Sequence, residues 1–453
     1  MDSQTIVAPM TPAGVSAVAA LRVSGSQVRL VVERLFGAKA AKGLKPRMAN
    51  LGTARDPNSG KVLDSLLYIY FESPNSYTGE DVLELYPHGN PLIVRDLLQT
   101  IRSIDGVRLA EPGEYTRRAF LNGKMDLTQA ESVADVIHSA NRAELENAHR
   151  LLSGALSKKI VTLTSQVKDI SARLELDVDF AEEEADPDFA GWEERFENIR
   201  ESIKGILNSF RGKANLSRLP LAVLYGAPNA GKSSLVNALL GEDRVLVSNV
   251  PGTTRDFVEV RLFLDGGEIR LVDTAGIAEH ATDELDALSM KKSREILEEA
   301  DFKILVVDGS DESDPVVQPD FIVHSKSDLT SCHPEPFGKL RAGTALYGVE
   351  GSLRISSKTG DGLAELKGVM NAALFKKNEN QEDLWITSER EKVCLEEALA
   401  GVDRVLNLLK TNPAVELLAF EMQLVRRALQ SITGEISSED ILQSIFAGFC
   451  IGK

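Results

Sequence analysis

The chain has few cysteines, no long apolar segment and no excess of positive charge, and each shortage excludes a class of protein. Its three cysteines, Cys332, Cys394 and Cys450, are too few and too scattered for a disulfide framework or a zinc site, which favours a reducing compartment. No apolar run reaches the roughly 18 residues that cross a bilayer, and the first residues lack the basic segment of a signal peptide. We therefore expect a cytoplasmic protein that has no membrane partner.

The charge balance limits how the chain could bind nucleic acid. Acidic residues outnumber basic ones by 68 to 51 among 453 residues, which gives a net charge of −17. This balance argues against a large basic surface for nucleic acid, but it leaves a local basic patch or a basic partner open. The length allows about three domains.

The most informative segment is a glycine loop at residues 226–233, which fits the pattern G-x-x-x-x-G-K-[ST]. An apolar run before the loop predicts a buried strand, and the residues after it predict a helix, as the motif requires. Backbone N–H groups in such a loop attract phosphate. We expect Lys232 to reach the β- and γ-phosphates of a nucleotide and Ser233 to ligate Mg²⁺. The nucleotide-binding candidates of this loop are Asn229, Ala230, Gly231, Lys232, Ser233 and Ser234.

Further short motifs follow in the order typical of GTP-binding proteins. Asp273 follows a predicted strand, where its carboxylate would hold Mg²⁺ through water, and the N–H of Gly276 would meet the γ-phosphate. Residues 325–328 are close to N-K-x-D, in which Asp328 would accept N1–H and the exocyclic amine of guanine. Residues 356–358 are close to S-A-K, which contacts guanine O6. The remaining candidates of this GTP site are Thr274, Ala275, Ser325, Lys326, Ser356, Ser357 and Lys358.

Two residues depart from the usual GTPase pattern. Ser325 stands where the guanine motif has Asn, whose amide ties this loop to the phosphate loop. A hydroxyl cannot span that distance, so we expect weaker nucleotide affinity. Ile277 stands where Ras-like enzymes carry a water-orienting Gln, so hydrolysis needs a partner's arginine or a bound cation. Asn229 could coordinate such a monovalent cation, or it could be only a turn residue after Pro228.

Regular apolar stripes predict long helices on both sides of the GTPase segment. The stripes at 160–174, 196–210, 395–409 and 415–432 repeat apolar residues at spacings of three and four, as the helices of a bundle do. Between the GTPase motifs, Thr254 is a candidate to close over Mg²⁺ as a switch.

The first part of the chain is predicted to mix strands with helices. Strands are predicted at 6–8, 17–23 and 66–71, and helices at 28–36 and 92–101, which indicates an α+β module. Glu84 lies between leucines at strand spacing, where a buried carboxylate is costly unless it is paired or used. Taken alone, the residues favour a surface position on an edge strand for Glu84.

We therefore predict a multidomain protein. An α+β N-terminal module covers residues 1–118, and a discontinuous helical-bundle domain covers 119–212 plus 376–453. A Ras-like α/β P-loop GTPase domain at 213–375 is inserted into the helical domain.

Nearly the whole length of the chain resembles the MnmE family of tRNA-modifying GTPases. The resemblance rests on residues 77–85, 112–116 and 118–127 of the first module, on 228–235 and 251–256 of the GTPase segment, and on the ending Phe449-Cys450-Ile451-Gly452-Lys453.

The resemblance implies ligands for the N-terminal module and for the GTPase domain. It implies a homodimer formed through the N-terminal module, which is also a folate-binding domain that holds 5,10-methylene-tetrahydrofolate. The positions that match the folate contacts are Arg22, Glu84, Lys124 and Lys453. The positions that match K⁺ ligands are Asn229, Ser248, Val250 and Thr253, and those that match Mg²⁺ ligands are Ser233 and Thr254. Asn249, Pro251 and Gly252 lie between these residues and join the GTP site.

The catalytic candidates are Asp286, Arg255 and Cys450. Asp286 matches a family Glu that aids the attacking water, but its side chain is one methylene shorter. Arg255 lies in the switch segment. Cys450 is either a nucleophilic thiol or a small buried apolar residue, and no histidine lies near it in sequence.

The resemblance also implies a reaction and partners. The family acts with MnmG, a partner that carries FAD, and the hetero-oligomer modifies C5 of the wobble uridine (U34) of certain tRNAs. The alternative is a ribosome-assembly GTPase that acts as an RNA-binding switch. Such proteins usually add a basic RNA-binding domain, and the sequence shows no G-x-x-G loop in a basic setting.

Overall fold

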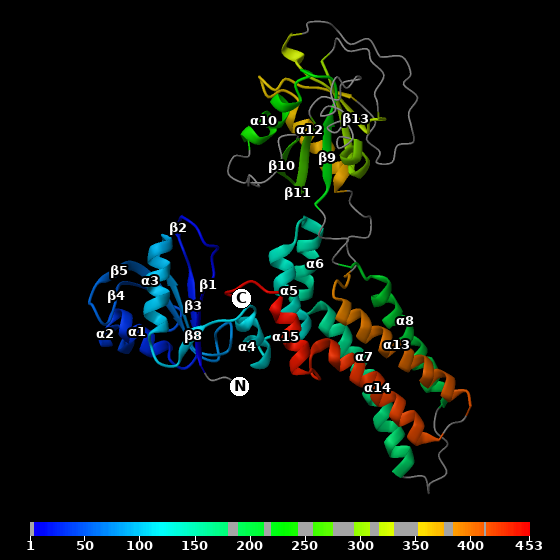
Figure 1. The fold of residues 1–453 in the computed structure, drawn as a ribbon. Coiled ribbons are helices and arrows are strands. Elements are labelled where there is room, and N and C mark those ends of the chain that lie inside the picture. Colours follow the sequence, from blue (N-terminus) through cyan, green and yellow to red (C-terminus); the bar gives the residue numbers. More distant parts are fainter. Residues whose placement is uncertain are drawn as a thin grey trace. The chain divides into compact units, whose positions relative to one another are not determined.

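The chain forms two compact units in a computed structural model (Figure 1). The structure describes residues 4–179, 189–212, 219–242, 257–274, 294–308, 317–329, 352–375, 384–411 and 414–453. The first unit combines Met1–His138, Ala148–Phe210 and Leu384–Lys453, and the second combines Ser139–Asn147 with Arg211–Asp383. The domain boundaries at residues 118, 212 and 376 stay predictions.

The N-terminal part of the first unit is a mixed sheet with helices packed on it, drawn in blue in Figure 1. The strand order is β4 (Ala49–Arg55), β5 (Val62–Phe71), β6 (Val82–Tyr86), β3 (Leu21–Ser24), β1 (Thr5–Pro9) and β8 (Val107–Leu109). Alternate residues of β5, among them Tyr68 and Tyr70, point into the core, as a half-buried strand requires. The helices α1 (Val28–Phe36) and α3 (Pro91–Arg102) supply the other half of this core. The short elements are α2 (Ala38–Lys42), β2 (Ser16–Val18) and β7 (His88–Gly89).

Two sequence-based expectations for this sheet are wrong. Residues 17–23 belong to two strands, the exposed β2 and the buried β3, which are separated by the buried Ala19 and Ala20. Here the chain changes partner, since β2 pairs with β7 and β3 pairs with β1 and β6. Glu84 is not on an edge strand, because β6 lies between β5 and β3.

Four long helices build the largest core of the first unit, and Figure 1 shows them side by side. They are α7 (Ala155–Asp179), α8 (Phe189–Asn208), α13 (Glu389–Leu409) and α14 (Val415–Thr433). The predicted apolar stripes are confirmed, since they meet in one buried cluster that includes Val167, Phe196 and Val402. A smaller cluster joins α5 (Leu127–His138) to α15 (Glu439–Ala447), beside α4 (Glu114–Leu121) and α6 (Arg142–Leu152).

The second unit contains a sheet of the predicted kind. Its strands lie in the order β10 (Phe257–Leu264), β11 (Gly267–Thr274), β9 (Leu221–Tyr225), β12 (Phe302–Val307), β13 (Phe321–His324) and β14 (Ser352–Arg354). The edge pair β10–β11 is antiparallel and the remaining pairs are parallel, which is the arrangement expected of a Ras-like domain. Its helices include α10 (Lys232–Glu242) and α12 (Leu363–Leu374), and η1 (Ser327–Leu329) is a short 3-10 helix.

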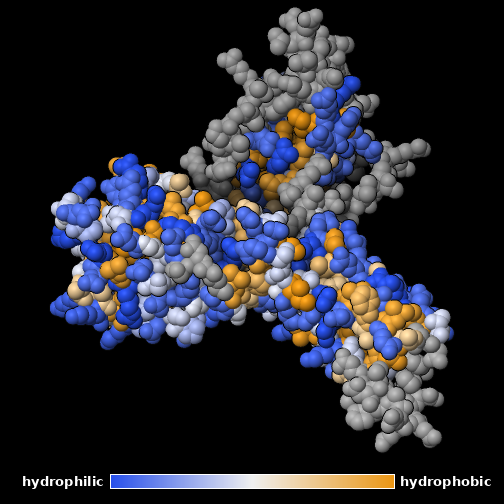
Figure 2. All heavy atoms as spheres, turned by 60° about the horizontal axis from the view of Figure 1, so that its bottom comes forward, coloured by the Kyte–Doolittle hydropathy of each residue, from blue (hydrophilic) through white to orange (hydrophobic). Residues whose placement is uncertain are grey.

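The described surface carries no continuous apolar belt in the view of Figure 2, which shows apolar residues in patches separated by hydrophilic ones. Within the described ranges, none of the helices combines the length and the hydrophobicity that crossing a bilayer demands.

Candidate functional site

The nucleotide-site candidates that the structure describes gather at one edge of the second unit's sheet. The parallel strands β9, β11, β13 and β14 all end at this edge, which is where open α/β sheets bind ligands. The glycine loop follows β9 and leads directly into α10, as the sequence predicts. Asp273 pairs with Leu224 across β11 and β9, so its carboxylate lies next to the start of the loop.

Two of the residues predicted to hold Mg²⁺, Ser233 and Asp273, lie together. Ser233 Oγ donates a hydrogen bond of 2.5 Å to Asp273 Oδ2. Asp273 is 6% exposed, and its other oxygen, Oδ1, accepts no hydrogen bond from any described residue. A buried carboxylate oxygen without a donor is costly, and a water bound to Mg²⁺ would satisfy it. The donor set therefore fits this ion.

Lys232 is drawn into the glycine loop. Its Nζ donates hydrogen bonds of 2.9 Å to the carbonyl oxygens of both Gly226 and Ala227. Burial lowers the pKa of Lys232, and the nearby Asp273 carboxylate opposes that shift. These carbonyl contacts hold the ammonium group over the part of the loop where phosphate is predicted to bind.

The guanine-recognition candidates form a connected pair of loops. Ser356, which is fully buried, donates from Oγ to Asp328 Oδ1 at 2.9 Å. Asp328 is exposed, and its Oδ2 accepts no hydrogen bond within the described part of the chain. One carboxylate oxygen is thus held by the protein while the other can accept from a base. Lys326 forms an ion pair with Asp308 at 3.0 Å, and Ser357 and Lys358 begin the turn after Ser356.

The expectation that Ser325 cannot reach the phosphate loop is wrong. Its Oγ donates a hydrogen bond of 2.5 Å to the carbonyl oxygen of Ala230. The loops approach closely because Gly231 has a φ of 95° and no side chain, and a Cβ there would lie 3.4 Å from Ser325 Oγ. The Ser325 hydroxyl therefore ties the guanine loop to the phosphate loop, which is the role of the longer Asn amide in the usual motif.

We expect Ser325→Ala to weaken GTP binding about fivefold, because one neutral hydrogen bond contributes about 1 kcal/mol. We expect no gain from Ser325→Asn, since the buried serine leaves little room for a longer side chain. Fluorescent-nucleotide titration measures both effects, and Ser327→Ala in the same loop is the matched control. An unchanged affinity for Ser325→Ala would show that the tie between the loops is not used.

Several predicted site residues lie outside the described residues, so their roles stay predictions. These are Ser248, Asn249, Val250, Pro251, Gly252, Thr253, Thr254, Arg255, Ala275, Gly276 and Asp286. The same holds for Ile277. Asn229 is described: its φ is 66°, a left-handed conformation that Asn tolerates in turns, and its side chain is exposed. This conformation suits a turn residue and also leaves the amide available to a cation.

A second site lies in the first unit, around Arg22 on β3. Arg22 pairs with Glu84 across the sheet, and its Nη2 lies 2.8 Å from Glu84 Oε1. Arg22 is only 8% exposed, yet its Nη1 has no hydrogen-bond partner among the described residues. Glu84 is thus a paired carboxylate, and Arg22 keeps one unsatisfied donor. A buried guanidinium N–H without an acceptor indicates a site for an anionic or carbonyl-bearing ligand.

Two tyrosines that the sequence analysis did not single out complete this site. The Arg22 guanidinium lies 4.8 Å from the ring centre of Tyr77 and 5.6 Å from that of Tyr115. Tyr115 also donates its hydroxyl to the Arg22 carbonyl oxygen at 2.6 Å. Both tyrosines stand inside the motifs that carry the family resemblance, but an aromatic residue in a motif does not reveal which side chain it covers.

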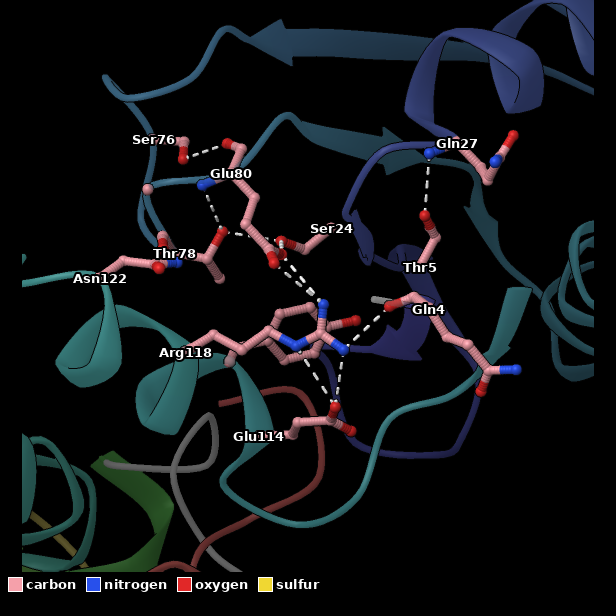
Figure 3. Close-up of polar contacts among 12 residues, drawn as sticks. Gln4, Thr5, Ser24, Gln27, Ser76, Thr78, Glu80, Glu114, Arg118 and Asn122 are labelled. Carbon is pink, nitrogen blue, oxygen red and sulfur yellow. Dashed lines mark hydrogen bonds and ion pairs between the residues drawn. The ribbon is translucent and has the colours of Figure 1, made fainter. Parts of the chain in front are cut away.

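A buried ion network fixes the loop that carries Tyr77, as Figure 3 shows. Arg118 donates to Glu80 at 3.1 Å and to Glu114 at 2.8 Å, and Ser24 Oγ donates to Glu80 at 2.7 Å. Burial raises the pKa of Glu114, but hydrogen bonds from Arg108, the Glu111 backbone and Arg118 outweigh it, so the net shift is downward. Each buried charge therefore has a partner, and the loop is held next to Arg22.

Of the remaining folate candidates, Lys453 reaches this site, whereas Lys124 contacts the loop between β5 and β6. Lys453 Nζ lies 5.8 Å from the Tyr77 ring centre. Burial lowers the pKa of Lys453, as does the positive charge of Arg22, whereas Glu84 opposes the shift. Lys124 Nζ donates to the Pro74 carbonyl oxygen at 2.9 Å, and no hydrogen bond or ion pair of the described residues joins it to Arg22.

The last residues are anchored on both sides of Cys450. Phe449 is buried in the small cluster between α5 and α15, and its ring centre lies 5.3 Å from that of Phe446. Gly452 has a φ of 99°, and a Cβ there would lie 2.3 Å from the Pro9 carbonyl oxygen. Cys450 itself is exposed, so it is not a buried apolar residue, and its Sγ lies 3.8 Å from His138 Nε2. The sequence could not indicate this histidine, which is 312 positions away.

Within the described residues there is no cluster of three His, Cys, Asp or Glu side chains that could hold a metal ion without an added ligand. Among the described residues, the Mg²⁺ site would use the Ser233 hydroxyl directly and the Asp273 carboxylate through a water, together with oxygens of the nucleotide.

Comparison with known proteins identifies relatives over the full chain. Residues 5–124 match the family model for the GTP-binding protein TrmE N-terminus, and residues 127–450 match that for the MnmE helical domain. The tRNA modification GTPase MnmE of Syntrophus aciditrophicus is 38% identical over 475 aligned residues, with 100% of both chains covered. The protein of the same name from Erwinia tasmaniensis is 36% identical over 466 residues, which cover 100% of this chain and 99% of that one.

Solved structures share smaller parts of the chain. A structure of Era from Aquifex aeolicus covers 41% of this chain and 67% of its own, with 22% identity and a TM-score of 0.26. The G domain of the FeoB iron transporter of T. maritima covers 34% of this chain and 99% of its own, with 24% identity and a TM-score of 0.23.

The family models and the full-length relatives favour the tRNA-modifying interpretation over that of a ribosome-assembly GTPase. The chain is a GTP hydrolase that acts in tRNA modification, and it belongs to the MnmE (TrmE) family of tRNA modification GTPases.

Proposed function

We propose that this tRNA modification GTPase binds 5,10-methylene-tetrahydrofolate around Arg22 and takes from it the one-carbon unit that modifies C5 of the wobble uridine (U34) of certain tRNAs. A partner that carries FAD, MnmG, acts with it in a hetero-oligomer in the cytoplasm. The observation that carries the proposal is the buried, unsatisfied Nη1 of Arg22 between two tyrosine rings and close to Lys453.

The donor set around Arg22 suits the chemistry of a folate. Folates combine a flat heteroaromatic ring that bears N–H donors with an anionic tail, so their site needs an aromatic surface, a cation and an acceptor. Tyr77 and Arg22 supply the first two. Glu84 accepts from Arg22 through Oε1 and from the Tyr86 hydroxyl through Oε2, and a carboxylate has about four acceptor positions, so it retains capacity for a ligand.

A strain that lacks this protein, complemented with variants, tests the proposal. Nucleoside analysis of its tRNA should show the C5 modification with the wild-type protein but not with Arg22→Ala. Folate binding by purified Arg22→Ala should be lost in parallel. The matched control is Arg29→Ala, which removes an exposed arginine from α1 in the same module. Full modification with Arg22→Ala would refute the assignment of this site.

We also propose that the N-terminal module forms a homodimer. Leu51 and Leu67 stand opposite each other on β4 and β5 and are 75% and 47% exposed. A second copy of the same face would remove this apolar surface from water. Sedimentation of the double variant Leu51→Asp and Leu67→Asp should give the monomer mass, and a mass unchanged from wild type would exclude this face as the interface.

We predict that K⁺ stimulates GTP hydrolysis at least tenfold over Na⁺, which corresponds to about 1.4 kcal/mol of transition-state stabilisation. Ile277 offers no amide to orient water, so another device must stabilise the transition state. Pairing of two GTPase domains around K⁺ would supply it, with Asn229, Ser248, Val250 and Thr253 as ligands. Phosphate release at equal ionic strength in the two salts measures the effect.

The control for this prediction uses the left-handed backbone of Asn229. Asn229→Gly removes the amide without straining a positive φ, whereas Asn229→Ala would add strain. Loss of the K⁺ effect in Asn229→Gly would support ligation. If Asn229→Gly retains the full K⁺ effect, Asn229 is only a turn residue.

The remaining assignments belong to the same proposal. Residues 1–118, 119–212 with 376–453, and 213–375 are taken as the three domains. Asp286 is assigned to the attacking water and Arg255 to the catalytic switch segment.

A further inference from the structure

We propose that Cys450 and His138 form a thiol–imidazole pair, in which His138 accepts the thiol proton and Cys450 is thereby made nucleophilic. The two residues are 312 positions apart in the sequence, yet Cys450 Sγ lies 3.8 Å from His138 Nε2. This separation is within the range of a hydrogen bond that involves sulfur. Both side chains are exposed, so a reagent or substrate can reach the sulfur.

The second contact of the imidazole fixes its tautomer. His138 Nδ1 lies 2.8 Å from the carbonyl oxygen of Ala134, one turn earlier on α5. A carbonyl oxygen only accepts, so the ring hydrogen must be on Nδ1. In the neutral ring Nε2 then carries a lone pair, which is available to the Cys450 thiol. The imidazole is therefore oriented as a proton acceptor for the sulfur.

The thiol is held in place by its neighbours. The buried ring of Phe449 fixes the chain on one side of Cys450, and Gly452 lies against Pro9 on the other side. A backbone hydrogen bond of 3.3 Å from the Lys453 N–H to the Cys450 carbonyl oxygen closes a turn between them. Because the backbone is fixed at both ends, the short distance to His138 is a property of the fold.

Three of the other charged groups on the surrounding helices have partners of their own. On α5, Glu131 pairs with Arg390 and Asp135 accepts from Thr387 Oγ1. On α15, Glu439 pairs with Arg117 of α4. Lys453 is the nearest cation in sequence, and it points to the Tyr77 ring. His138 is thus the proton acceptor that the described contacts place at the sulfur.

The proposed step balances without an oxidant or a reductant. The thiol proton moves from Sγ to Nε2, which leaves a thiolate beside an imidazolium. The thiolate electron pair then forms a bond to an electron-poor carbon that is doubly bonded, so the π bond of that carbon breaks, and the imidazolium gives its proton to the atom that receives the π electrons. Lys453 places the turn beside Arg22 and Tyr77, so the carbon would belong to a ligand of that site; this last point alone rests on the proposed function.

Alkylation of the full-length protein by iodoacetamide tests the pair. Peptide mass spectrometry reports each cysteine separately. We expect Cys450 to react at least tenfold more slowly in His138→Gln than in wild type near neutral pH, because glutamine cannot take up the proton. At a pH well above about 8.5, the ordinary pKa of a thiol, the two rates should converge.

The experiment has two controls, an internal one and a second histidine variant. Cys394 is an internal reference, since burial raises its pKa and its rate should not respond to position 138. His149→Gln removes another exposed histidine and should leave Cys450 as reactive as in wild type. Equal rates near neutral pH would overturn the pair, and so would a slow rate in His138→Gln at every pH, because that would indicate altered access. The assay needs neither folate nor tRNA, so its failure is separate from failure of the proposed function.

Discussion

Removal of residues 450–453 is expected to abolish tRNA modification while GTP hydrolysis stays near its normal rate. The deletion takes away the Cys450 thiol and the Lys453 ammonium group that lies 5.8 Å from the Tyr77 ring centre. Chemistry on a nucleobase requires the base to leave its stack and enter a fixed site, so losing groups at such a site removes the reaction. The glycine loop and Asp273 belong to the other compact unit and keep all their contacts.

The readout of this experiment is paired. Phosphate release follows GTP hydrolysis, and tRNA digests follow the modified nucleoside. The truncated protein should stay folded, because Phe446 and Phe449 remain in their cluster with α5. Ile451→Ala, which trims an exposed side chain in the same segment, is the control that should retain modification. Unimpaired modification by the truncated protein would show that the segment is only a structural end.

Asp328→Asn is expected to shift the preference of the GTPase from GTP towards xanthosine triphosphate. In the wild type, Ser356 Oγ holds Asp328 Oδ1 at 2.9 Å, so Oδ2 can accept from the guanine N–H groups. An Asn side chain can accept from Ser356 through its oxygen and present its NH₂ group to the base. That group repels the guanine amine but donates to the oxygen that xanthine has there. Two lost hydrogen bonds to a charged acceptor cost roughly 3 kcal/mol or more, which is a loss of GTP affinity of about a hundredfold.

Competition between the two nucleotides in a binding assay measures this shift. Asp265→Asn is the matched control, because Asp265 is exposed in the β10–β11 turn and does not follow any of the parallel strands. If Asp328→Asn binds GTP as tightly as the wild type, guanine is not recognised by this carboxylate.

The sequence predicts the GTPase sheet and the long helices well, because both depend on local patterns. Apolar runs followed by polar ends mark β9 and β13, and the spacing of three and four marks α7 and α14. The candidate Mg²⁺ residues Ser233 and Asp273 are also found from the sequence, since each stands at a fixed offset from a strand end.

The sequence could not indicate features that depend on the spatial distance between residues far apart in the chain. Glu84 looked exposed because its pairing with Arg22 is set by the sheet order, which local patterns do not contain. The reach of Ser325 depends on how closely two loops approach, and a motif comparison assumes a standard separation. The histidine beside Cys450 could be found only from the way in which the end of the chain packs against α5.

The discontinuous first unit has a consequence for folding during synthesis. The helices α7 and α8 leave the ribosome before Arg211–Asp383, the main segment of the second unit. The helices α13 and α14, which cover their apolar stripes, leave after it. During that interval the apolar faces of α7 and α8 have no native cover, and such exposure favours chaperone capture or aggregation. The second unit needs no later segment for its sheet and can fold in the meantime. Protease protection of α7 in nascent chains should therefore appear only after α14 has emerged. The speed of translation through the second unit then determines how long α7 and α8 remain without α13 and α14.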